Sequence, residues 1–241
     1  MSKVSRTAAY VALYRALETV DRRRSPLFHD PYATRFLTTP LKAAVQVARF
    51  PILRALVTRY ADARAPGART SAIARTAFID DVVRGTLQTG VTQVVILGAG
   101  YDCRSQRMPE LVLGRARVFE VDRQPTQDRK RALLGSSTSI YVPVDFLQDD
   151  TFARLASQGW NRAIPTLFIW EGVTNYLDEA AVSRVLTDVA GCAETSSIVF
   201  TYVHRGVIDG SESFTGADKI LHNVRAMGEA REKESCSSQV P

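Results

Sequence analysis

The chain has 241 residues, a formal net charge of +6 and a hydrophobic content of 45%. These values suit one folded α/β protein with a full core and a small additional part, and they exclude extensive disorder. No basic run alternates with aromatic residues, so we expect no nucleic-acid partner. No apolar run reaches the length of a membrane span and no apolar leader is present, so we expect no membrane partner and a cytoplasmic location.

The three cysteines, Cys103, Cys192 and Cys236, lie far apart in the chain. None has CxxC spacing, and the three histidines do not cluster near them. This pattern argues against a disulfide framework and against a structural zinc site. We therefore expect reduced thiols and no metal.

The first third of the chain predicts helices. Apolar spacing predicts an amphipathic helix from Ser5 to about Glu18, with Ser5 as its cap. A second helix is expected over Leu41 to Tyr60, kinked or broken at Pro51. A third is expected over Thr70 to Gln88, before a glycine that is typical of a helix end. The first two of these helices predict a cap or substrate lid over residues 1–68.

After residue 90, short apolar runs alternate with segments of helix length. The expected strands are Val94–Leu97, Arg117–Val121, Ile140–Val144, Thr166–Trp170 and Ser197–Val203. The expected helices between them are Pro125–Leu134, Asp149–Ser157 and a third that Asp178 caps and that runs to Ala190. This alternation predicts right-handed crossovers and a mostly parallel sheet with helices on both faces, over residues 69–214. A polar tail follows at 215–241, with one helix expected over Thr215–Glu232.

A glycine turn follows the first expected strand, within the stretch QVVILGAGYDCRSQRM. The strand runs directly into Gly98, Ala99 and Gly100. Glycines let the backbone turn sharply and leave no side chain where a ligand could lie. In open α/β sheets, ligands bind outside the carboxyl ends of the strands. We therefore expect these three residues to form the floor of a nucleotide-type pocket.

Acidic residues follow the later strands: Asp122 ends the second, Asp145 the third and Glu171 the fourth. Any one of them alone could be an ordinary helix N-cap. Three acids and a glycine turn at the same edge of a sheet indicate one site. Asp122, about two dozen residues after the glycines, suits a bidentate hydrogen bond to ribose hydroxyls.

The glycine turn also discriminates between ligands. A dinucleotide fingerprint requires a third glycine, and Cys103 stands at that position. Asp102 stands where a phosphate would be repelled. A phosphate-free, cationic nucleoside such as S-adenosylmethionine (SAM) fits better than NAD(P). The carboxylate of that ligand would require an arginine; Arg75 precedes the first strand, although it could equally be an exposed helix residue.

Several segments together resemble the leucine carboxyl methyltransferase family, which includes bacterial and fungal enzymes that O-methylate polyketides and other small molecules. The segments are GAGYDCR, FEVD (Phe119–Asp122), VDF (Val144–Phe146), EGVTNYL (Glu171–Leu177), SRTAAYVALYRALE, LFHDPYATRF and ARTAFIDD. The resemblance runs from about Ser5 to about Gly228. It implies a Rossmann-like class I methyltransferase fold, SAM as cofactor and a small-molecule acceptor.

The resemblance also implies a role for each candidate residue. Arg75 would bind the SAM carboxylate, and Glu171 would face the SAM amino group. Gly98 would lie under the methionine moiety, and Asp122 would hold the ribose. Asp145 and Phe146 would address the adenine, the acid through the exocyclic amine and the ring by stacking. Tyr176 would brace the EGVTNYL segment, whereas Trp170 is expected to be a core residue.

The C-terminus departs from the family pattern. Relatives continue past Gly228 with an antiparallel pair of strands, and here the sequence AREKESCSSQVP stands instead. This predicts a chain without those strands. The alternative to an active O-methyltransferase is then a catalytically defective SAM-binding remnant that acts as a dimer partner or regulator. A second copy of the chain stays open as a partner.

No catalytic residue can be assigned from the motifs. A carboxylate acceptor is already a nucleophile and needs no general base, whereas an alcohol or phenol would gain from one. His204, just past the fifth expected strand, is the only histidine placed for that role, and a loop residue is its more ordinary interpretation.

Overall fold

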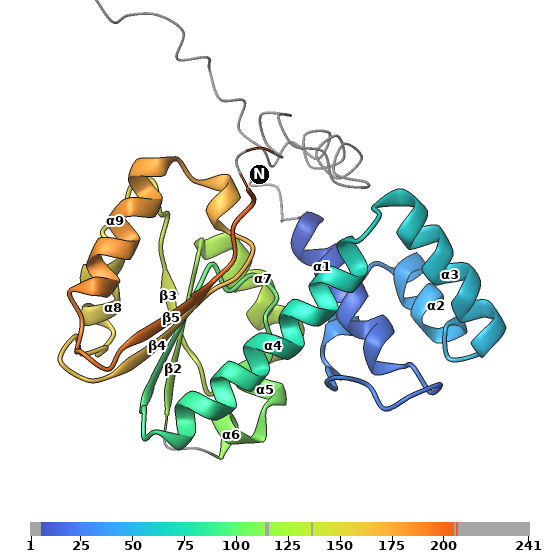
Figure 1. Cartoon of the computed structure of the whole chain (residues 1–241), viewed down its shortest axis with the longest axis horizontal. Helices are drawn as coiled ribbons and strands as arrows, with labels where there is room; N and C mark the ends of the chain where they lie inside the picture. The colour runs from blue at the N-terminus through green and yellow to red at the C-terminus, as the bar shows by residue number, and fades with distance from the viewer. Residues whose placement is uncertain (1–5, 114–115, 136, 205, 207–241) are drawn as a thin grey trace, which may run out of the picture.

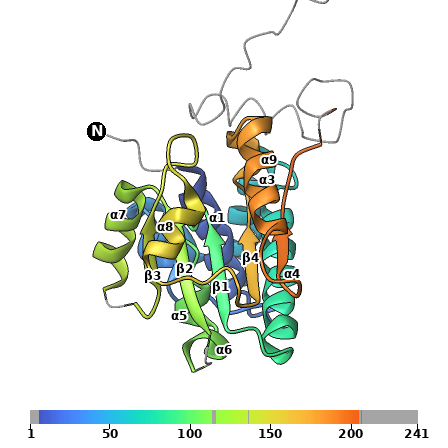
Figure 2. The ribbon, with the colours of Figure 1, turned by 90° about the vertical axis from the view of Figure 1, so that its left-hand side faces the viewer.

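A computed structural model describes residues 6–113, 116–135, 137–204 and 206. In these ranges, a five-stranded sheet is flanked by helices, and a further helical layer lies beside it (Figures 1 and 2). All strand pairs are parallel, in the order β3-β2-β1-β4-β5. The predicted α/β class and parallel sheet are confirmed. Because β2 and β3 lie on one side of β1 and β4 and β5 on the other, the topological switch point falls between β1 and β4.

Every expected strand is present in the sheet. The strands are β1 (Gln93–Leu97), β2 (Arg117–Asp122), β3 (Ile140–Pro143), β4 (Thr166–Trp170) and β5 (Ser197–Phe200). The third and fifth end earlier than predicted. The fifth ends at Phe200, which pairs with Trp170, the last residue of β4, so Val203 lies beyond the end of β4.

The central strands are buried on both faces, which explains their continuous apolar sequences. Val95 and Leu97 face α8 (Thr151–Ser157) and α9 (Glu179–Ala190), whereas Val94 and Ile96 face α4 (Ala68–Gln88). Asp178 caps α9 as predicted, since its carboxylate accepts the backbone N–H of Ala181 at 2.7 Å. The other helices of this part are α5 (Arg104–Arg107), α6 (Pro109–Val112) and α7 (Gln124–Leu134).

The N-terminal residues form a separate helical layer. Its elements are α1 (Arg6–Thr19), the 3-10 helix η1 (Ala33–Phe36), α2 (Thr39–Val47) and α3 (Pro51–Arg64). The single helix expected over Leu41–Tyr60 is broken at Pro51, which begins α3. α1 packs on α4 through a core that contains Ala12, Leu13 and Ala72. Figure 1 shows α2 and α3 on the side of α1 and α4 that faces away from the sheet.

Some expectations lie outside the described residues: the helix at Thr215–Glu232, the lack of C-terminal antiparallel strands and the cap at Ser5. Of the helices that are described, none has the length and apolar character needed to cross a bilayer. Nor do the described side chains include a group of three or more His, Cys, Asp or Glu that could hold a metal ion.

A buried ion pair holds α7 against β2. Lys130 Nζ lies 2.5 Å from Glu120 Oε2, and both side chains are almost fully inaccessible to solvent. The hydroxyls of Ser105 and Ser139 donate to Glu120 Oε1 at 2.7 and 2.9 Å. Burial lowers the pKa of Lys130, but the charges of Glu120, Cys103 and Asp102 together outweigh it, so the pKa is raised. Lys130 therefore stays charged, and the pair joins β2 to α7 and, through Ser105, to α5.

Removing one partner of this pair should be costly, because it leaves an uncompensated buried charge. We expect Lys130→Met to lower the unfolding free energy by about 3–5 kcal/mol. The double variant Glu120→Gln/Lys130→Met should lose less, since no net charge remains buried. Urea unfolding measures both; a single variant within about 1 kcal/mol of the wild type would contradict the assignment.

Candidate functional site

The glycine turn brings the ends of β1 and β4 into contact. Gly98 and Gly100 have positive φ angles of 66° and 48°, a backbone region that favours glycine. A Cβ at Gly98 would lie 2.3 Å from Cγ2 of Val173, in the segment after β4. Only glycine therefore allows this close approach. It occurs at the switch point, where α/β sheets bind ligands.

The end of β2 is bonded to the same turn. The amide of Gly100 donates to Asp122 Oδ2 at 2.6 Å, and the amide of Arg123 donates to Oδ1 at 2.7 Å. Burial raises the pKa of Asp122, although these two amides act in the opposite direction. Each carboxylate oxygen can accept a second hydrogen bond, so the group keeps the capacity to bind a pair of hydroxyls.

Ala99 occupies a different environment from the two glycines. Its amide donates to the carbonyl of Val121 at 2.9 Å, and its side chain is buried in the core beneath α4. Ala99 therefore joins β1 to β2, and its part in cofactor binding stays a prediction.

Arg75 and Glu171 form a pair at the switch point. Arg75 Nε, on α4, lies 2.7 Å from Glu171 Oε1, at the end of β4. Arg104 Nη1 contacts the other carboxylate oxygen at 3.0 Å. Burial raises the pKa of Glu171, but Arg104 and Arg75 outweigh it, so the pKa is lowered. About a quarter of the Arg75 side chain is exposed (26%), so solvent and solutes can reach the pair.

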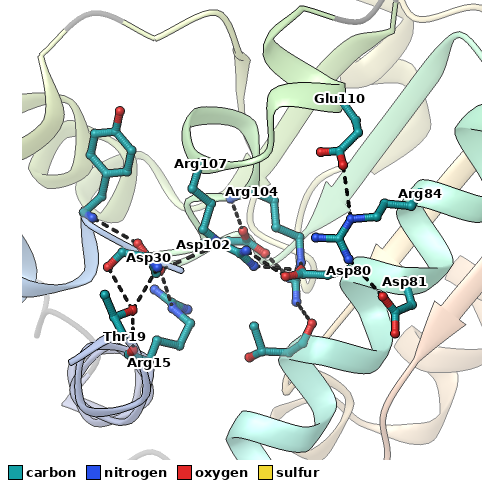
Figure 3. A network of polar contacts seen from close by, with 12 residues as sticks. Arg15, Thr19, Asp30, Asp80, Asp81, Arg84, Asp102, Arg104, Arg107 and Glu110 are labelled. Atoms are coloured by element: carbon teal, nitrogen blue, oxygen red, sulfur yellow. Dashed lines mark hydrogen bonds and ion pairs between the residues drawn. The ribbon is translucent and has the colours of Figure 1, made fainter. Parts of the chain in front are cut away.

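Arg104 is a residue that the sequence analysis did not single out. Its buried guanidinium contacts Asp102 as well as Glu171, and its Nε lies 2.8 Å from Asp80 Oδ1. Arg107 contacts the other oxygen of Asp80 at 2.7 Å (Figure 3). Asp80 and Glu171 lie far from Arg104 in the chain, on α4 and at the end of β4, and no local spacing rule predicts these two contacts.

The ion pair of Asp102 with Arg104 corrects the expectation that Asp102 would repel a phosphate. Burial raises the pKa of Asp102, but Arg104 and further cations lower it to about 2. The carboxylate is therefore ionised, and a buried guanidinium compensates its charge. Asp102 therefore repels a phosphate less strongly than its position in the sequence suggests. The missing third glycine is then the one remaining feature of the turn that disfavours a dinucleotide.

The helical layer is attached to the glycine turn by a second group of charges. Arg15 Nε, on α1, lies 2.9 Å from Asp30 Oδ2 (Figure 3). Arg15 Nη2 donates to the carbonyl of Tyr101 at 2.5 Å. The ring of Tyr101 stacks on Phe36 of η1, with centroids 4.3 Å apart. The turn is thus fixed from both the sheet and the helical layer.

Asp145 and Phe146 lie at the end of β3, beside the strand that ends in Asp122. Asp145 Oδ1 accepts the amide of Leu147 at 3.0 Å, and the Phe146 ring lies 6.5 Å from that of Trp170. Asp145 also lines a hollow of about 440 Å³ between the ends of β2 and β3. In the described ranges, neither residue bonds to the glycine turn. Trp170 is fully buried, as expected of a core residue.

His204 is exposed in the segment after β5, and its Nδ1 accepts the amide of Gly206 at 3.3 Å. Tyr176 is half-buried in the 3-10 helix η2 (Thr174–Tyr176), where its amide donates to the carbonyl of Val173 at 2.9 Å. The roles of both residues stay predictions.

An α/β fold with a glycine turn and charged strand ends defines the class of nucleoside-binding sheet proteins. Within that class, the sequence profile of leucine carboxyl methyltransferases matches residues 8–190. The chain therefore belongs to the leucine carboxyl methyltransferase family. It is a methyltransferase that uses SAM, as the sequence predicted.

Curated relatives agree with this assignment. A protein of Streptomyces avermitilis is 36% identical over 90% of this chain and 76% of its own length. A protein of Frankia alni is 35% identical over 86% of this chain and 72% of its own length. Both are named, provisionally, as SAM-dependent methyltransferases.

Solved structures resemble the chain only distantly. TnmH has a TM-score of 0.34 at 18% identity, over 90% of this chain and 72% of its own. LepI, in a structure with SAM, has a TM-score of 0.36 at 15% identity, over 55% and 33% of the two chains. Likeness at this level carries no argument about the site.

The close approach at Gly98 can be tested by substitution. Gly98→Ala should lower the unfolding free energy by about 2–4 kcal/mol, the sum of a left-handed backbone and a clash. Gly90→Ala is the matched control, because Gly90 also has a positive φ (88°) but has nothing within 4 Å of an added Cβ. Gly98→Ala/Val173→Ala should recover the clash component. Equal losses for the Gly90 and Gly98 single variants would contradict the contact.

The Asp102–Arg104 pair predicts a defined pH dependence. A lowered pKa of about 2 gives stability that is present above the ordinary aspartate pKa and is lost as the pH falls through about 2. At pH 7, Asp102→Asn should therefore cost about 2 kcal/mol of unfolding free energy, and this difference should shrink between about pH 4 and pH 2. Chemical unfolding across that range measures it. A difference that does not change with pH would contradict the assignment.

Proposed function

We propose that this chain transfers the methyl group of SAM to a carboxylate or hydroxyl oxygen of a small molecule. The observation that carries the proposal is the Arg75–Glu171 pair, partly exposed beside Gly98 at the switch point. Family membership supports the methyl-transfer chemistry. The choice of oxygen as acceptor is supported by the family, whose name refers to carboxyl methylation.

The paired charges suit an amino-acid head group. SAM carries an α-carboxylate and an α-ammonium, which require one cation and one anion. Arg75 would take the carboxylate and Glu171 the ammonium, so each would exchange its present partner for one on the ligand. Arg104 would keep Glu171 ionised during that exchange, because its guanidinium stays 3.0 Å from the other oxygen.

The ribose and adenine of SAM would bind at the carboxyl ends of β2 and β3. Asp122, held by the amides of Gly100 and Arg123, would accept both ribose hydroxyls. Gly98 would lie under the methionine moiety, as the family resemblance implies. Asp145 and Phe146, at the next strand end, would address the adenine.

Bound SAM supplies an electrophilic methyl group on a sulfonium, and transfer is an in-line displacement. The protein's part is to hold donor and acceptor in line and to exclude water. A carboxylate acceptor needs no proton removed, which suits a site whose arginines and carboxylates are already paired. A hydroxyl acceptor would use a general base, and His204 is the candidate that the sequence offers.

Binding of SAM and of adenosine distinguishes the residues that would hold the ribose from those that would hold the amino acid. Asp122→Ala should weaken both SAM and adenosine by about 100-fold, because both ligands carry the ribose hydroxyls. Arg75→Gln should weaken SAM and leave adenosine unchanged, because adenosine lacks the amino acid. Asp81→Ala, an exposed carboxylate on α4, is the control and should change neither. Isothermal titration measures all three; unchanged SAM affinity in Asp122→Ala would overturn the ribose assignment.

The acceptor atom can be identified from the product. The wild-type chain is incubated with methyl-labelled SAM and a small-molecule extract, and the product is treated with mild base. A methyl ester releases labelled methanol. Where the label is kept, NMR of the product identifies the atom that carries it, and a methyl ester or a methyl ether supports O-methylation. Label found on nitrogen, carbon or sulfur would contradict it. SAM binding without any transfer would favour the catalytically defective remnant.

A further inference from the structure

Large apolar side chains gather on the exposed face of α3 and on the turn before it. Phe50, Ile52, Leu56 and Tyr60 have relative exposures of 64%, 80%, 60% and 64%, and Leu53 is also exposed. Single exposed apolar residues are ordinary, whereas a group on one helix marks an interaction surface. We call these five residues the α3 stripe.

The α3 stripe is continuous along the helix. With about 100° per residue, Ile52, Leu53, Leu56 and Tyr60 fall within an arc of about 100°. Arg59 lies just outside one edge of this arc and Arg64 just outside the other. The Arg64 guanidinium packs over the Tyr60 ring at 5.2 Å. The face is thus an apolar band with an arginine on each flank.

The opposite side of α3 attaches the helix to the protein. Arg54 is buried there, with Nη2 2.8 Å from Asp21 Oδ2 and Nη1 donating to the carbonyl of Leu17 at 2.6 Å. Val57 and Ala61 pack against the core of the helical layer. The α3 stripe is therefore not needed to hold α3 in place.

The net charge of α2, α3 and the turn between them is positive. Residues 39–64 contain five basic residues and one acid, Asp62. Asp62 is already paired with Arg69 at 2.7 Å, and Arg54 is the buried cation described above. The exposed cations that remain on α2, α3 and the turn between them are Lys42, Arg49, Arg59 and Arg64. An apolar stripe surrounded by exposed cations suits a partner that is apolar inside and anionic at its surface.

We propose that the basic, apolar face of α2 and α3 binds the surface of an anionic lipid bilayer, with α3 lying in the plane of the headgroups. The α3 stripe would enter the acyl boundary, and the flanking arginines would meet lipid phosphates. A symmetric pairing of two copies is disfavoured, because it would place the same cations of both chains against each other. The expectation of no membrane partner rested on the lack of a spanning run, which a helix lying on a bilayer does not require.

Vesicle flotation tests the proposal with the full chain. The chain should float with phosphatidylcholine vesicles that contain phosphatidylglycerol, should not float with phosphatidylcholine alone, and should be released by high salt. Ile52→Ser/Leu56→Ser removes the apolar part, and Arg49→Gln/Arg59→Gln removes two cations. Each should lower the partition coefficient by about tenfold or more.

Matched controls use exposed residues elsewhere. Leu113→Ser and Arg184→Gln change an exposed apolar and an exposed basic residue away from α3, and they should bind vesicles as the wild type does. All variants should keep the wild-type circular dichroism, because every altered side chain is exposed. Absence of flotation with anionic vesicles, or equal flotation of the α3 variants, would overturn the proposal. So would a dimer in solution that Ile52→Ser/Leu56→Ser dissociates, since a second copy would then cover the face.

Discussion

The buried guanidinium of Arg104 fixes three carboxylates that come from distant parts of the chain. Asp80 belongs to α4, Asp102 to the glycine turn and Glu171 to the end of β4. A charge inside a protein is tolerated only with good partners, so displacing any one of these elements would expose an uncompensated ion. Burial lowers the pKa of Arg104, but its three carboxylate partners outweigh it and the pKa is raised. The cation is therefore permanent, and the geometry of the switch point depends on it.

Two further contacts hold other parts of the chain at the glycine turn next to Arg104. Gly98 lets the segment after β4 reach the turn after β1, which places Glu171 beside Arg75. Arg15 and Asp30 join the helical layer to the same turn from the other side. The sheet and the helical layer thus meet at the residues that we propose to bind the cofactor.

Periodicity predicted the fold well because strands and helices are local patterns. The five strands, the break at Pro51 and the cap at Asp178 follow from apolar runs and from proline and capping chemistry. The contacts of Arg104 with Asp80 and Glu171 could not be predicted in this way, since they join residues more than twenty positions apart on different elements. The contact of Arg104 with Asp102 is local, but the burial of Arg104 depends on those distant partners, so the sequence overstated the repulsive effect of Asp102.

The central claim is that this switch point binds a phosphate-free, cationic nucleoside that bears an amino acid. Calorimetry tests it most directly, by titrating the wild-type chain with SAM and, separately, with NADH. The Arg75–Glu171 pair and the lack of a third glycine predict saturable binding of one SAM per chain and no binding of NADH. Binding of NADH without binding of SAM would contradict the account.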